Sequence, residues 1–160
     1  MTLFPYDRQE AVRYARRWAL ARNPVYYDFE HIGGDCTNFA SQCIYAGSRT
    51  MNFLPVYGWY YTSLHDRAPA WTDVDYLYRF LSGNKGAGPF GRQTDASHVL
   101  PGDLVQLGKN NGDFYHCPVI TEVSPRILVC AHSRDRKDVP LASYLYEQIR
   151  FVHIDGVRSM

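Results

Sequence analysis

GGDCTNFASQCIYAG, residues 33–47, contains the signals for both ends of a helix. The two glycines permit a tight turn, Asp35 offers an N-cap oxygen, and apolar residues then recur at helical spacing from Cys36 to Ile44. Gly47 is typical of a helix end. The stretch therefore predicts a helix that begins at Cys36 and holds this cysteine in its first turn.

The elements expected around this helix change in type along the chain. Amphipathic spacing predicts helices over residues 8–22 and from Thr72 or Asp73 to Leu81. β-branched runs separated by turn residues predict strands at 104–107, 115–123, 127–131 and 149–154. Helices first and strands second favour an α+β fold, with N-terminal helices packed on a C-terminal antiparallel sheet, in one domain over residues 1–160.

A Gly-rich stretch, residues 86–91, matches the G-x-G-x-x-G pattern of dinucleotide binding. A helix is expected before it instead of a strand, and no amphipathic helix follows it. We therefore interpret it as a loop.

Composition narrows the classes of partner. The net charge is +1, and no Lys/Arg cluster interleaves with aromatic residues, so nucleic acid is not an expected partner. No stretch approaches the roughly 20 apolar residues of a membrane span. Charged residues interrupt the N-terminal segment, so no signal peptide is expected in this chain, which points to the cytoplasm or to a domain of a longer secreted bacterial protein.

Cys36 is the residue with the clearest potential for chemistry. The start of a helix favours thiolate over thiol, as a nucleophile requires, although a buried structural cysteine is the alternative. A base is available in His116 at the start of the second predicted strand, residues 115–123. If residues 115–123 and 127–131 form a hairpin, residues pair when their numbers sum to about 248, which places His132 opposite His116. His132, or Asp135 just beyond it, would then orient the His116 ring.

Several strings resemble one family over essentially the whole chain. Residues 34–43, GDCTNFASQC, resemble the D-C-T-N-F-x-S-Q-C string of the putative amidase domain family, a branch of the papain-like, NlpC/P60-type cysteine peptidases. The further similarities are Tyr6-Asp7-Arg8 in the opening helix, Trp59-Tyr60-Tyr61 and Trp71 in the aromatic middle, Pro101-Gly102-Asp103-Leu104 in a turn, Tyr115-His116 in the His strand, and Ala131-His132-Ser133 with Asp135 in the strand of the third residue.

This resemblance implies a papain-like fold and a cysteine amidase or peptidase. Cys36 would be the nucleophile, His116 the base and His132 the orienting residue, with Asp135 as the alternative third residue. Asp35 would help to recognise a substrate amine or act only as an N-cap, and Trp59 and Tyr60 would contact substrate. No cofactor is implied, and the implied substrates are peptidoglycan peptides or other short amides.

Three alternatives remain open at this point. An acyltransferase would use the same residues but pass the acyl group to an amine or alcohol instead of water. A catalytically inactive module would bind peptides or glycans through an aromatic groove. A metal site would use His116, Cys117, Cys130 and His132, although strand alternation places the first two on opposite faces.

Overall fold

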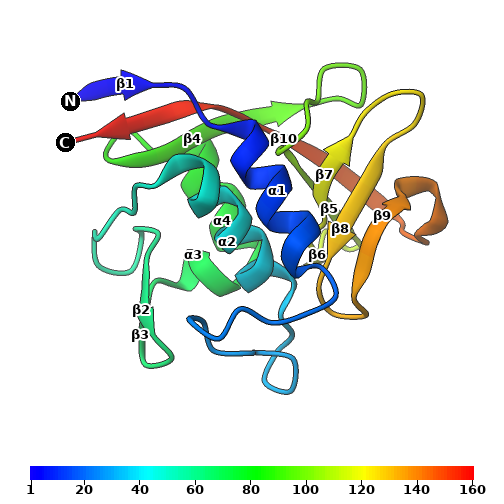
Figure 1. Cartoon of the computed structure of the whole chain (residues 1–160), viewed down its shortest axis with the longest axis horizontal. Coiled ribbons are helices and arrows are strands. Elements are labelled where there is room, and N and C mark those ends of the chain that lie inside the picture. The colour runs from blue at the N-terminus through cyan, green and yellow to red at the C-terminus, as the bar shows by residue number, and fades with distance from the viewer.

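A computed structural model describes all of residues 1–160. Its architecture is α+β, with the helices packed against an eight-stranded antiparallel sheet (Figure 1). The predicted α+β class with an antiparallel sheet is therefore confirmed. The helices are α1 (Arg8–Trp18), α2 (Cys36–Ser48), α3 (Pro69–Thr72) and α4 (Val74–Gly83), with a short 3-10 helix, η1, over Leu141–Ser143.

The sheet has the strand order β1-β10-β5-β7-β8-β9, with β4 paired to β10 and β6 paired to β5. β1 and β10 bring the two ends of the chain side by side (Figure 1). A separate hairpin, β2 with β3, lies outside this sheet. The strands are β1 (Thr2–Phe4), β2 (Tyr61–Ser63), β3 (Asp66–Arg67), β4 (Gly88–Thr94), β5 (Leu104–Gly108), β6 (Phe114–His116), β7 (Val119–Glu122), β8 (Leu128–Ala131), β9 (Arg136–Pro140) and β10 (Gln148–Ser159).

The helix predictions hold best where a cap accompanies the apolar spacing. Asp73 caps α4 by accepting a hydrogen bond from the backbone N–H of Tyr76. α1 ends at Trp18, short of the predicted residue 22. The Trp18 carbonyl accepts from the N–H of Ala21 at 3.2 Å and from the His132 ring at 2.7 Å. The chain therefore tightens into a turn before it reaches Pro24.

Two predictions of local structure are wrong, each for a local reason. Residues 115–123 do not form one strand, because Pro118 has no N–H and β6 ends before it while β7 begins after it. The Gly-rich loop expected at residues 86–91 instead enters strand β4. A Cβ at Gly91 would lie only 2.0 Å from the carbonyl oxygen of His153, so a glycine is required there for β4 to pair with β10.

Apolar residues cover both faces of the sheet. Neighbouring positions alternate between the core under the helices and a smaller core on the opposite face, as Leu104 and Val105 do in β5 and Val119 and Ile120 do in β7. Every helix is too short or too polar to cross a membrane.

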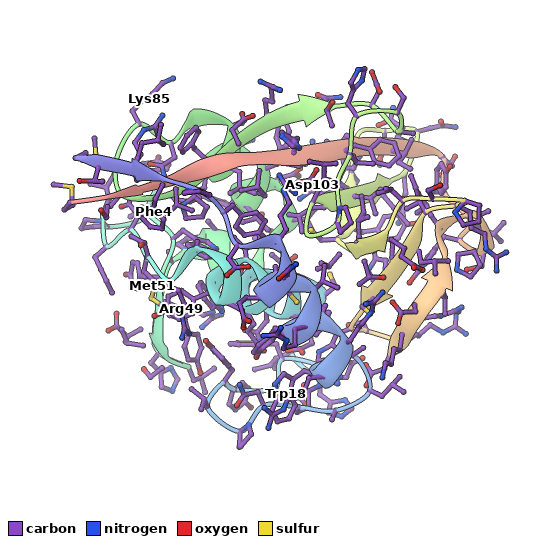
Figure 2. All side chains as sticks on the ribbon, turned by 45° about the horizontal axis from the view of Figure 1, so that its top comes forward. Phe4, Trp18, Arg49, Met51, Lys85 and Asp103 are labelled. Carbon is purple, nitrogen blue, oxygen red and sulfur yellow. The ribbon has the colours of Figure 1, made fainter.

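Asp103 ties the first turn of α1 to the sheet (Figure 2). This buried carboxylate accepts hydrogen bonds from Arg8 at 2.7 Å, from the His153 ring at 2.7 Å and from the Ile154 N–H at 2.9 Å. It also accepts from the Leu100 N–H at 2.8 Å, which closes the turn before β5. The Pro-Gly-Asp-Leu turn is therefore a structural joint between helix and sheet.

Candidate active site

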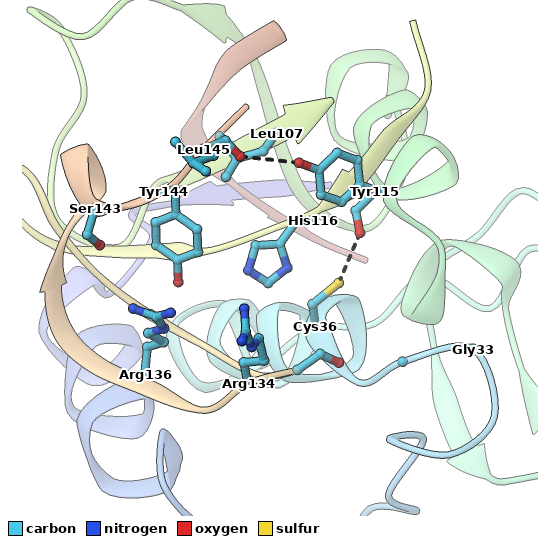
Figure 3. Close-up of a pocket in the computed structure, with 12 residues that line it drawn as sticks. Gly33, Cys36, Leu107, Tyr115, His116, Arg134, Arg136, Ser143, Tyr144 and Leu145 are labelled. Carbon is cyan, nitrogen blue, oxygen red and sulfur yellow. Dashed lines mark hydrogen bonds between the residues drawn. The ribbon is translucent and has the colours of Figure 1, made fainter. Parts of the chain in front are cut away.

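Cys36 is the first residue of α2 and lines a cavity of about 530 Å³. Gly33 and Gly34 precede this helix and also line the cavity. Their φ values are 92° and 95°, in the left-handed region that glycine adopts without strain. The Sγ atom lies 3.8 Å from the carbonyl oxygen of Tyr115 on the neighbouring strand (Figure 3). The other residues around the cavity are Leu107, His116, Ser133, Arg134, Arg136, Ser143, Tyr144 and Leu145.

His116 is the last residue of β6 and faces the same cavity as Cys36. Figure 3 shows its ring between Tyr144 and Cys36. The ring packs on Tyr144 with centroids 5.5 Å apart, and no protein group forms a hydrogen bond with either ring nitrogen. The predicted nucleophile and base are thus brought together, while the base has no orienting partner in the protein.

Burial determines the charge state of this pair. Burial raises the pKa of the Cys36 thiol. Hydrogen bonds from Thr37 and from the backbone N–H of Cys117 lower this pKa, but they offset only part of the rise. Burial also lowers the pKa of His116 to about 4, with a further contribution from the charge of Arg136. Desolvation is the largest cause of the shift, so the pKa of Cys36 is raised where the position at the start of α2 was expected to lower it. Near neutral pH the site holds a neutral thiol beside a neutral imidazole.

His132 lies outside the cavity, in the core between α1 and α2. Its Nδ1 lies 2.6 Å from Asp35 Oδ2 and its Nε2 lies 2.7 Å from the Trp18 carbonyl oxygen, both within hydrogen-bond distance. Its ring stacks on Phe39 with centroids 4.1 Å apart. Both ring nitrogens are therefore occupied, and the predicted hydrogen bond from His132 to His116 is absent.

The break at Pro118 explains this correction. His116 belongs to β6 and pairs with Leu107 of β5, so it takes no part in the hairpin with β8. In that hairpin Val119 pairs with Cys130, a sum of 249 where about 248 was expected. The register inferred from the sequence is therefore one residue out, which exchanges the two faces of the strand.

Asp35 is fully buried, and it serves as an anchor for the loop before Cys36. Its Oδ1 accepts from the Phe29 N–H at 2.8 Å and from Asn38 Nδ2 at 2.9 Å, while its Oδ2 is taken by His132. The side chain makes no capping bond to the backbone of α2. Asp35 therefore has no exposed oxygen for a substrate amine, and its expected side-chain N-cap does not form.

The other predicted site residues also lie away from Cys36. Asp135 accepts two hydrogen bonds from Arg22, at 2.8 and 3.1 Å, and does not line the cavity. Trp59 is fully buried and donates to Ser41 at 3.0 Å, so the prediction that it contacts substrate is wrong. Tyr60 packs on Phe53 with ring centroids 5.3 Å apart, outside the cavity.

The remaining cysteines are buried free thiols. Burial raises the pKa of Cys117 to about 12 and that of Cys130 to about 11, and raises that of Cys43 strongly. Cys36 alone of the four lines the cavity described above. No group of three or more His, Cys, Asp and Glu side chains is arranged to hold a metal ion.

Sequence reasoning missed one wall of the cavity. Arg134 and Arg136 come from the β8–β9 turn and the start of β9, and Tyr144 follows η1. The β9 sequence, RKDVP, lacks the apolar run that signals a strand. The sequence therefore contains no signal that could have placed these side chains near Cys36.

Comparison with known proteins agrees with the resemblance at the family level. A family model described as "Putative amidase domain" matches residues 5–154. "Uncharacterized protein YhbB" of Bacillus subtilis (strain 168) is 29% identical over 142 residues, which cover 88% of this chain and 41% of that protein. The chain thus spans about two fifths of the length of this relative. No solved structure matches the chain.

Proposed function

Since the chain belongs to the putative amidase domain family, we propose that it hydrolyses amide bonds with Cys36 as nucleophile and His116 as general base. The observation that supports this most directly is the shared cavity: the cysteine at the start of α2 and the histidine at the end of β6 both line it. The papain-like, NlpC/P60-type assignment is part of the proposal. A cysteine-bearing helix packed on an antiparallel sheet that carries the histidine is consistent with it.

The charge state of the pair defines the first step. Cys36 Sγ attacks the carbonyl carbon as its proton passes to His116, so a sulfur–carbon bond forms and the carbonyl oxygen gains the negative charge. The backbone N–H of Cys36 stands at the helix start, where N–H groups lack intrahelical acceptors, and it is suited to stabilise this oxyanion. His116 then gives the proton to the leaving nitrogen as the carbon–nitrogen bond breaks.

The second half of the reaction regenerates the thiol. The amine departs and leaves a thioester on Cys36. Water then attacks the thioester carbonyl as His116 takes one of its protons, the carbon–sulfur bond breaks, and the sulfur recovers a proton. The products are an amine and a carboxylic acid. Short peptides of the peptidoglycan type are the first substrates to test.

The test is digestion of muropeptides and a panel of simple peptide amides, followed by mass spectrometry. Wild type should release an amine and a free acid, and Cys36→Ala should release neither. Cys43→Ala is the matched control, because it makes the same change in the same helix at a buried thiol away from the cavity. Hydrolysis by Cys36→Ala at the wild-type rate would overturn the proposal. Recovery of an acyl group on an added amine would indicate an acyltransferase instead.

A further inference from the structure

Two arginines form one wall of the Cys36 cavity. Arg134 lies in the β8–β9 turn and Arg136 is the first residue of β9. Figure 3 shows Arg136 below Tyr144 and Arg134 below His116, between Arg136 and Cys36. No aspartate or glutamate lines the cavity, so these two positive charges have no negative charge facing them there.

The nearby carboxylates are already paired with other arginines. Asp135 and Glu30 both bind Arg22, at 2.8 and 3.2 Å. Asp138, two residues beyond Arg136 in the strand, binds Arg16 at 3.1 Å. Neither Arg134 nor Arg136 forms an ion pair within the protein. A guanidinium group left free in a concave site has the geometry to bind a carboxylate through two parallel hydrogen bonds.

The turn that holds Arg134 is strained and anchored. Ser133 and Arg134 have φ of 25° and 58°, a region that residues other than glycine seldom adopt. The Ser133 hydroxyl accepts from the Asp35 N–H at 3.0 Å and donates to Glu30 at 3.2 Å. The turn is thereby fixed to the residue that precedes Cys36. Arg136 in turn lies over the Tyr144 ring, 5.5 Å from its centroid.

We propose that Arg134 and Arg136 bind a carboxylate of the substrate, so that the preferred substrates are amides that carry a free carboxylate beside the bond that is cleaved. This inference rests on the proposed function, because it takes the cavity of Cys36 as the substrate site. The carboxylate is either the C-terminal group of a peptide or an acidic side chain, and both offer the same two oxygens to the arginines.

Two alkylating reagents test the proposal without knowledge of the natural substrate. Iodoacetate and iodoacetamide have nearly the same shape, and both form a sulfur–carbon bond with release of iodide, but only iodoacetate carries a carboxylate. Peptide mapping measures the rate at which each reagent labels Cys36, and the iodoacetate rate is divided by the iodoacetamide rate. This ratio is then divided by the same ratio measured for N-acetylcysteine, which corrects for the intrinsic reactivity of the two reagents. We expect wild type to favour iodoacetate by about tenfold after this correction, a difference of about 1.4 kcal/mol.

Substitution of the two arginines should remove this preference. The double variant Arg134→Gln/Arg136→Gln should bring the corrected ratio to about 1, while Arg126→Gln, an exposed arginine away from the cavity, should leave it unchanged. A wild-type ratio of about 1, with Cys36 readily labelled by iodoacetamide, would overturn the carboxylate site and leave the proposed nucleophile intact. Failure of both reagents to label Cys36 would instead contradict the proposed function.

Peptide pairs then distinguish the two sources of the carboxylate. A peptide with a free C-terminus is compared with its C-terminal amide, and a peptide containing glutamate with its glutamine counterpart. The pair in which the neutral member is hydrolysed at least about tenfold more slowly identifies the source. Equal hydrolysis within both pairs would overturn the proposal.

Discussion

Replacement of His132 by alanine should destabilise the fold instead of removing a catalytic group. The change deletes the hydrogen bond to Asp35 and the one to the Trp18 carbonyl, and it leaves the Asp35 carboxylate buried with one partner fewer. Loss of a hydrogen-bond partner from a buried charged group costs upwards of about 3 kcal/mol. Arg22 Nε lies 3.5 Å from the same carboxylate and limits the loss, so about 3 kcal/mol is expected.

This loss is large enough to measure by thermal unfolding. For a chain of this length about 3 kcal/mol corresponds to a fall in Tm of roughly 6–12 °C. His153→Ala is the matched control, because it removes an equivalent hydrogen bond to buried Asp103 and should also lower the Tm. At a temperature where both variants are folded, each should retain amide hydrolysis within about tenfold of wild type, since neither histidine contacts His116.

A triad role for His132 would give the opposite result. Loss of the residue that orients a catalytic histidine lowers kcat by about 10⁴ in the best-studied triad while the geometry stays intact. If His132→Ala melts within about 2 °C of wild type and its kcat falls by about 100-fold or more, the structural role argued for His132 is wrong.

Three further predictions address the charge state and the neighbours of Cys36. As the pH falls, kcat/KM should decline only near the His116 pKa of about 4, because the imidazole remains unprotonated above it; a decline near 6.5 would contradict the lowered pKa. The alkylation rate of Cys36 by iodoacetamide should rise in a single step, at a higher pH than for a free cysteine, and a rate that is already constant below that step would indicate a preformed ion pair. Asp135→Ala should leave kcat unchanged and lower the free energy of unfolding in urea by at most about 1 kcal/mol, because it breaks only a partly exposed ion pair with Arg22. A large loss of kcat would show that Asp135 takes part in catalysis.

Three of the four helices, α1, α2 and α4, could be predicted because apolar spacing and the residues at helix ends are local signals. α2 begins at Cys36 and α4 follows the Asp73 cap, both as expected. The strands depended on tertiary pairing. β4 contains two glycines and β9 is polar, and each is a strand because a neighbouring strand supplies the hydrogen bonds.

Only two residues of the candidate site, Cys36 and His116, could be predicted from the sequence, because the start of a helix marks the first and the family strings contain both. Cys36 and His116 do meet in one cavity. The role of His132 could not be inferred, because it depends on a carbonyl of α1 that is free only where that helix ends. Arg134 and Arg136 depend on a left-handed turn at two residues that are not glycine, for which the sequence carries no marker.

The most direct test of the central claim is detection of an acyl group on Cys36. Wild type is mixed with an amide substrate identified in the digestion screen, quenched in acid within milliseconds to seconds, and mapped by mass spectrometry. The proposed chemistry predicts that the peptide containing Cys36 gains the mass of the acyl fragment, that hydroxylamine removes it, and that His116→Ala does not form it. Turnover with no acyl group on Cys36 in a single-turnover time course, or an acyl group on another residue, would contradict it.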